Sequence, residues 1–122
     1  MNIQIRRIYE TPQDHDGIRI LVDRIWPRGI SKEKAQLDAW WKDIAPSSEL
    51  RKWVHRDMNR WQEFKDFYKQ ELRRNKDYLS ERFALMDPGK SIVLLYGSRN
   101  KEKNHASVLK EFIEEEYLLD NG

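Results

Sequence analysis

Short apolar runs along the chain predict strands, and the longer stretches between them carry helical spacing. Three runs have the length and β-branched content of strands: Ile3 to Ile8, Ile18 to Val22 or Asp23, and Ser91 to Tyr96. The last run is apolar at nearly every position, which is typical of a strand covered on both faces of a parallel sheet. It is therefore expected to be central in the sheet.

Helical spacing occupies most of the chain between the second and third strands. Ser31 is a candidate N-cap for a first helix. The expected apolar face of that helix comprises Ala35, Leu37, Trp40, Trp41 and Ile44. Ser47 is expected to begin a second, shorter helix, and Asn59 a longer one that breaks near residues 73–75. A last helix starts at about Asn104 and follows the third strand.

These elements predict an α/β fold with a small, mostly parallel sheet of about three strands, covered by helices. The second strand, a multi-helix crossover and the third strand form a right-handed unit, in which the two strands are parallel. The first strand is expected to pair antiparallel at an edge. With 122 residues, the chain has the size of one domain, which is expected to extend over residues 1–122.

Composition and charge narrow the class of protein. Lys and Arg number 23 against 21 Asp and Glu, and this net charge of +2 is too small to demand a nucleic-acid or anionic-lipid partner. The absence of cysteine excludes disulfides, thiolate zinc sites and thiol nucleophiles. No apolar run approaches the roughly 20 residues of a membrane span, and no export signal is visible. A cytoplasmic location without a membrane partner is therefore expected.

Arginines gather directly after two of the predicted strands. Residues 23–29 follow the second strand, and residues 97–100 follow the third. Ligands of open α/β sheets bind beyond the carboxyl ends of the strands, so Arg24, Arg28 and Arg99 are expected near one rim. Guanidinium groups bind phosphate or carboxylate, and the start of the last helix adds a partial positive charge. The sequence predicts a pocket for a small anionic ligand.

Two groups of candidate site residues follow from this placement. The candidate ligand-binding residues are Arg19, Arg24, Trp26, Arg28, Arg99 and Asn104. The candidate acid–base or orienting groups, in case the protein is an enzyme, are Asp23, Tyr96 and His105. His105 stands in the first turn of a predicted helix, where the positive helix end favours its neutral form. No metal-ligand spacing and no glycine-rich phosphate loop appears, so neither a metal nor a cofactor is expected.

Two alternatives to a small-molecule pocket stay open. In the first, the arginines form an internal ion-pair network that fixes the loops, and Trp26 fills the core. In the second, tryptophans such as Trp40, Trp41 and Trp53, interleaved with basic residues, bind single-stranded nucleic acid. Aromatic residues at helical spacing are more typical of a core. A nucleic-acid-binding or protein-interaction module without catalytic activity thus ranks second, after the small-molecule pocket.

Three motifs carry a resemblance to a known family. Residues 17–29 read Gly-x-Arg-x-Leu-Val-Asp-Arg-x-Trp-Pro-Arg-Gly, and residues 46–52 read Pro-Ser-x-Glu-Leu-Arg-Lys. A Leu-Leu-Tyr strand at 94–96 is followed by Asn-His-Ala at 104–106. With these motifs, nearly the whole chain resembles the YeaO-like branch of the family of domain of unknown function 488, a group of small bacterial proteins.

The resemblance implies a shared pocket at the strand ends without implying a reaction. It adds Ser47, Glu49 and Arg51 to the motif residues placed there. Longer relatives have Cys-His-Arg near residues 104–106, and this chain lacks that Cys and Arg, which argues against thiol-based chemistry. Position 99 is Arg where relatives have Lys, a change that keeps the charge and alters the hydrogen-bonding geometry.

Overall fold

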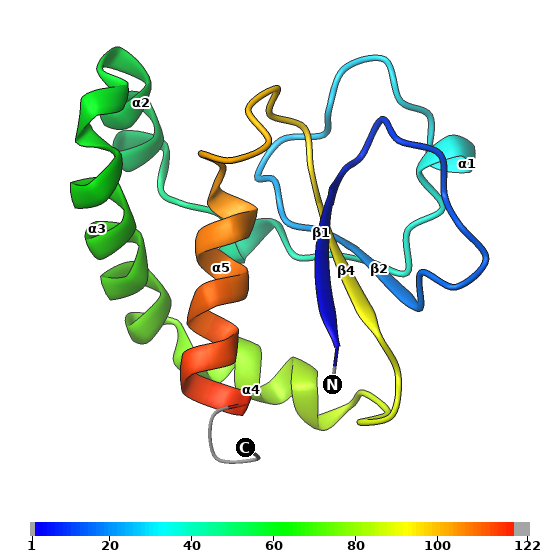
Figure 1. Cartoon of the computed structure of the whole chain (residues 1–122). Helices are drawn as coiled ribbons and strands as arrows, with labels where there is room; N and C mark the ends of the chain where they lie inside the picture. The colour runs from blue at the N-terminus through cyan, green and yellow to red at the C-terminus, as the bar shows by residue number, and fades with distance from the viewer. Residues whose placement is uncertain (1, 119–122) are drawn as a thin grey trace.

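A four-stranded sheet with helices on both faces forms the centre of the protein (Figure 1). The structure is a computed structural model of the chain and describes residues 2–118. The strands are β1 (Ile3–Arg7), β2 (Ile18–Leu21), β3 (Ala39–Trp40) and β4 (Ile92–Tyr96). Their order is β1-β4-β2-β3, and every pairing is parallel. The predicted α/β class and the central position of the last strand are confirmed.

Five α-helices lie within residues 2–118. They are α1 (Lys32–Ala35), α2 (Ser48–Arg56), α3 (Trp61–Arg74), α4 (Lys76–Ala84) and α5 (His105–Ile113). Two 3-10 turns, η1 (Lys42–Ile44) and η2 (Met58–Arg60), and a π-helical turn, η3 (Glu114–Leu118), complete them. Ser47 caps α2 and the last helix starts beside Asn104, as predicted; both side-chain oxygens accept a backbone N–H, so Asn104 is the cap of α5. None of these helices is both long and apolar enough to cross a bilayer.

The two faces of the sheet are covered unequally. One face packs against α3 and α5 and forms the larger core, to which Ile20, Leu94 and Phe112 belong. The other face, with Leu21 and Val93, is covered by α1 and the segment before it. In Figure 1, α2, α3 and α5 stand together on one side of β4, and α1 lies on the other. Strand β4 is buried at all five positions, as its apolar sequence predicts.

The predicted antiparallel pairing of the first strand is wrong. Strand β1 does lie at an edge, but it runs parallel to β4, from Ile3 beside Ile92 to Arg7 beside Tyr96. The segment 8–17 therefore returns the chain to the start of the sheet. There Gly17 has φ +76°, and a Cβ atom on it would lie 2.2 Å from the carbonyl oxygen of Ser91. Only glycine allows β2 to begin this close to β4.

The predicted Ser31 N-cap is confirmed, but the predicted continuation of this helix to Ile44 is wrong, and the sheet has four strands where about three were expected. Helix α1 ends at Ala35 because Gln36 adopts a left-handed conformation with φ 48°. The guanidinium of Arg19 donates to the carbonyls of both residues, which satisfies the helix end from outside. The chain then forms β3, in which strand alternation leaves Trp40 partly exposed.

A buried group of charges holds the start of β2. The Asp16 carboxylate accepts from Arg6 at 2.6 Å and from Arg19 at 2.8 Å, and the Asp16 and Arg19 side chains are almost fully buried. Burial alone would raise the pKa of Asp16, but the hydrogen bonds from the Gln13 backbone and both arginines lower it below its ordinary value. This group corresponds to the internal ion-pair alternative for Arg19.

Replacing Asp16 with Asn should lower the free energy of unfolding by roughly 3 kcal/mol, because two guanidinium groups lose their partner. The charged form stabilises the fold above the ordinary aspartate pKa of 3.8, and this contribution is lost as the pH falls through the lowered pKa. The difference in the free energy of unfolding between Asp16→Asn and wild type should therefore become smaller at acidic pH. Urea unfolding at several pH values measures it, with Asp14→Asn, exposed in the same segment, as the control. Equal effects of the two substitutions would contradict this account.

Candidate functional site

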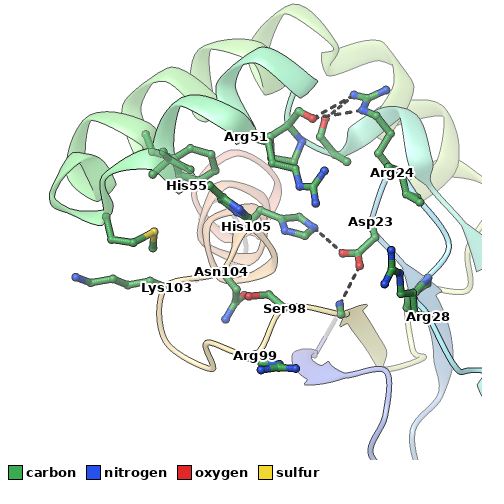
Figure 2. A pocket seen from close by; sticks show the side chains of 18 of the residues that line it. Asp23, Arg24, Arg28, Arg51, His55, Ser98, Arg99, Lys103, Asn104 and His105 are labelled. Atoms are coloured by element: carbon green, nitrogen blue, oxygen red, sulfur yellow. Dashed lines mark hydrogen bonds and ion pairs between the residues drawn. The ribbon is translucent and has the colours of Figure 1, made fainter.

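A hollow of about 670 Å³ lies beyond the carboxyl ends of β2 and β4 (Figure 2). One wall consists of Tyr9, residues 23–28 and residues from 97 to 105. The facing wall consists of residues 45–46 and one side of the segment from Arg51 to Phe64. We call the space between the two walls the strand-end hollow. Parallel strands direct their loops and the next helix N-terminus to this edge of a sheet, which is where ligands of such folds bind.

Asp23 connects the two loops at the base of the hollow. Its Oδ2 accepts the backbone N–H of Gly97 at 2.9 Å, and the indole Nε1 of Trp40 donates to its backbone carbonyl at 2.7 Å. A Cβ atom on Gly97 would lie 2.9 Å from this carboxylate oxygen, so a side chain there would force the two loops apart. The carboxylate thus fixes the end of β4 against the loop after β2.

The His105 ring joins α5 to the same point. Its Nε2 lies 3.0 Å from the carbonyl oxygen of Val22 and 3.1 Å from Oδ1 of Asp23. A carbonyl oxygen only accepts, so Nε2 carries a proton directed at Val22. Oδ1 of Asp23 is buried and accepts no hydrogen bond within residues 2–118. With Nε2 protonated, only Nδ1 of the neutral ring is left to accept a proton.

Arg24 lines the hollow but its guanidinium is occupied by backbone carbonyls. It donates to the carbonyl of Ala45 at 3.0 Å and to that of Pro46 at 3.3 Å, as the dashed lines in Figure 2 show. These carbonyls lie just before α2, whose capping residue Ser47 is in turn held by Glu71 of α3. Arg24 therefore ties the loop after β2 to the helical wall.

Four other basic side chains line the hollow without a partner. They are Arg28, Arg51, Arg99 and Lys103. All four are exposed, and their charged groups form no hydrogen bond or ion pair with any part of the chain between residues 2 and 118. Figure 2 places Arg51 on the helical side and Arg28 and Arg99 on the loop side. These groups remain available to a ligand, and the start of α5 adds a partial positive charge at the same edge.

Reasoning from residue patterns did not place Arg51 or His55 in the site, and only the family resemblance connected Arg51 with the pocket. Both lie on α2, four residues apart, and so share one face of the helix. Burial, then Arg51 and then His105, lower the pKa of His55 below its ordinary value. The Ser47 cap, which directs the start of α2 toward this edge, together with the four-residue spacing, was the signal that could have identified the pair.

The remaining predicted site residues divide into those inside and outside the hollow. Trp26 and Asn104 line it, although Trp26 also packs edge-on against Trp40, and Asn104 is buried as the cap of α5. Arg19 and Tyr96 do not line it. Tyr96 is buried in the larger core, and its pKa is raised by burial and by Glu10.

The structure therefore brings seven of the nine predicted residues to one hollow. They are Asp23, Arg24, Trp26, Arg28, Arg99, Asn104 and His105. Within the described part of the chain, no group of three or more His, Asp or Glu side chains is arranged to hold a metal ion.

Comparison with known proteins identifies relatives over the whole length. The family model described as "Inactive DUF488-N3 subclade" matches residues 2–121. The protein named "Uncharacterized protein YeaO" of Escherichia coli K12 is 42% identical over 113 residues, covering 93% of this chain and 97% of its own. "Uncharacterized protein Rv3073c" of Mycobacterium tuberculosis H37Rv is 39% identical over 112 residues, covering 91% and 92%. No solved structure matches the chain.

Replacing Arg51 with Gln should raise the pKa of His55 toward its ordinary value of 6.5, because one of the charges that disfavour the imidazolium is removed. NMR titration of the His55 ring protons measures the shift. Arg56→Gln is the matched control, since Arg56 is adjacent to His55 and does not line the hollow. An unchanged His55 pKa in Arg51→Gln would show that the guanidinium does not face the histidine.

Proposed function

The chain belongs to the DUF488 family, within the subclade described as inactive, and we propose that it binds a small phosphate- or carboxylate-bearing molecule without catalysing a reaction. One observation carries the proposal: four cations without a partner in the described part of the chain, Arg28, Arg51, Arg99 and Lys103, line a single hollow at the strand ends. Exposed basic side chains are common, but their gathering around a hollow beside a helix N-terminus favours an anion.

The position of the carboxylate in the hollow is compatible with an anionic ligand. Asp23 is bonded to the Gly97 N–H and lies beside the His105 ring, so its charge is directed toward the loops and α5. Arginine on each side of the hollow offers planar pairs of donors that match phosphate or carboxylate oxygens. The ligand would thus contact both the loop wall and the helical wall.

Binding without chemistry is supported by what the candidate acid–base groups do. In this proposal Asp23 and His105 are positioning residues: the carboxylate joins two loops, and the protonated Nε2 of His105 is directed at a carbonyl. Tyr96 lies in the core. The chain has no cysteine to act as a nucleophile, and the matched subclade is described as inactive.

Replacing both Arg28 and Arg99 with Gln should weaken sulfate or phosphate binding by about tenfold, because two exposed charge-assisted contacts of roughly 1 kcal/mol or less each are removed. NMR titration of the backbone amides measures the affinity, and the shifts should centre on residues 23–28 and 97–105. Arg74→Gln, exposed on α3 outside the hollow, is the control. The proposal fails if wild type binds neither anion or if both variants bind equally.

The same titration tests the nucleic-acid alternative. A short single-stranded oligonucleotide should bind no better than the small anions. Oligonucleotide binding that survives the Arg28 and Arg99 changes and falls steeply with salt would instead favour a nucleic-acid surface elsewhere on the protein.

Sulfate affinity should rise as the pH falls through the lowered pKa of His55. An anion held beside Arg51 would favour the imidazolium and raise this pKa in the complex, so binding takes up a proton. Sulfate keeps its charge between about pH 5 and 8, which isolates the contribution of histidine. His55→Gln should flatten the dependence. A pH-independent affinity in wild type would place the anion away from the helical wall.

A further inference from the structure

The strand-end hollow has two chemically different sides. The loops after β2 and β4, and the approach to α5, contribute cations through Arg28, Arg99 and Lys103. The loop side also has the apolar side chains of Tyr9, Ile25 and Trp26, whereas most of the lining from α2 to α3 is apolar. The apolar residues of this second side, which we call the apolar side, are Val54, Met58, Trp61 and Phe64. Arg51 and His55 lie on this second side as its basic residues.

The size of the hollow exceeds what a bare anion needs. Its volume of about 670 Å³ is within the range of sites that enclose a whole small molecule, roughly 300–1,000 Å³. Val54 and Phe64 are buried in the larger core, so an inorganic phosphate on the cations would leave chiefly Met58 and Trp61 in contact with water on the apolar side. Apolar surface in a ligand site is stabilised when a ligand covers it. The volume and the lining favour a ligand with a second, apolar part next to its anionic group.

The residues on the apolar side favour an aromatic ring for that part. The Trp61 and Phe64 rings stack at 4.8 Å with an angle of 21° between their planes, and Met58 stands beside them in η2 with 37% of its surface exposed. Thioether sulfur and aromatic faces both pack well on planar rings. A guanidinium such as that of Arg51 binds an anion or stacks on a ring plane. Across the hollow, Trp26 adds a half-buried indole.

We propose that the strand-end hollow takes a phosphate monoester of a planar aromatic group. The phosphate lies against Arg28 and Arg99, and the ring lies against Met58 and Trp61. This inference rests on the anion-binding function proposed above and specifies its ligand class. In this proposal the apolar side of the hollow determines which phosphorylated ligands bind.

Phenyl phosphate, cyclohexyl phosphate and inorganic phosphate together test the inference. The two esters carry the same charge at about pH 8, above the second phosphate pKa, and differ in whether the ring is planar and aromatic. Phenyl phosphate should bind wild type about tenfold more tightly than inorganic phosphate, and several-fold more tightly than cyclohexyl phosphate. The Met58 methyl resonance should move upfield with phenyl phosphate only, because an aromatic ring current acts on it.

Met58→Ala provides the matched variant, since Met58 is partly exposed and its loss leaves the larger core intact. It should reduce the advantage of phenyl phosphate over inorganic phosphate about threefold and leave inorganic phosphate binding unchanged. Leu85→Ala, the removal of an 88% exposed side chain outside the hollow, should change neither.

The outcomes distinguish this inference from the function on which it rests. Equal affinities of wild type for phenyl and inorganic phosphate, with a loss in the Arg28 and Arg99 variant, would overturn the aromatic ligand and keep the anion site. Equal affinities for phenyl and cyclohexyl phosphate, both tighter than inorganic phosphate, would replace the aromatic ring with an unspecific apolar group. No binding of any of the three would overturn both proposals.

Discussion

The contact between the Asp23 carboxylate and the Gly97 N–H holds the ends of β2 and β4 in one arrangement, on which the hollow depends. His105 extends the contact to α5, and Trp40 supports it from β3 through the Asp23 carbonyl. Strands β2, β3 and β4 and helix α5 thus meet at residues 22 and 23, through the Asp23 carboxylate and the two backbone carbonyls. The carboxylate lies at the base of the hollow and holds its loops together. It therefore also fixes the backbone positions from which the basic side chains extend.

Local patterns were sufficient to predict the elements that are defined by their own residues. The apolar run of β4 and the capping residues Ser47 and Asn104 each act within a few positions, and the structure confirms them. Two features depend on distant contacts and were mispredicted. The end of α1 depends on Arg19, which arrives from β2, and the direction of β1 depends on its pairing with β4, which follows much later in the sequence. Periodicity along the chain contains neither contact.

The candidate site shows the same division. Arginines placed directly after strands were correctly brought to one edge, because a parallel sheet directs all such loops there. Residue type did not distinguish an arginine that faces the hollow from one that serves the scaffold. Arg24 donates to the carbonyls before α2, and Arg19 is buried with Asp16, whereas Arg28 has no partner within residues 2–118. Residue patterns alone did not indicate the helical wall, because α2 belongs to the crossover rather than to a strand end; only the family resemblance included Ser47 and Arg51.

Within residues 2–118 the charged groups of Arg28, Arg51, Arg99 and Lys103 form no hydrogen bond or ion pair, which separates these side chains from the contacts that hold the fold. Exposed, unpaired charges contribute little to the free energy of unfolding, whereas Asp23, Gly97 and Arg19 take part in contacts that the fold requires. The four cations can therefore be exchanged, one at a time, at almost no cost in stability. On such a scaffold, single substitutions at the edge of the hollow can change ligand specificity during evolution while the fold is kept.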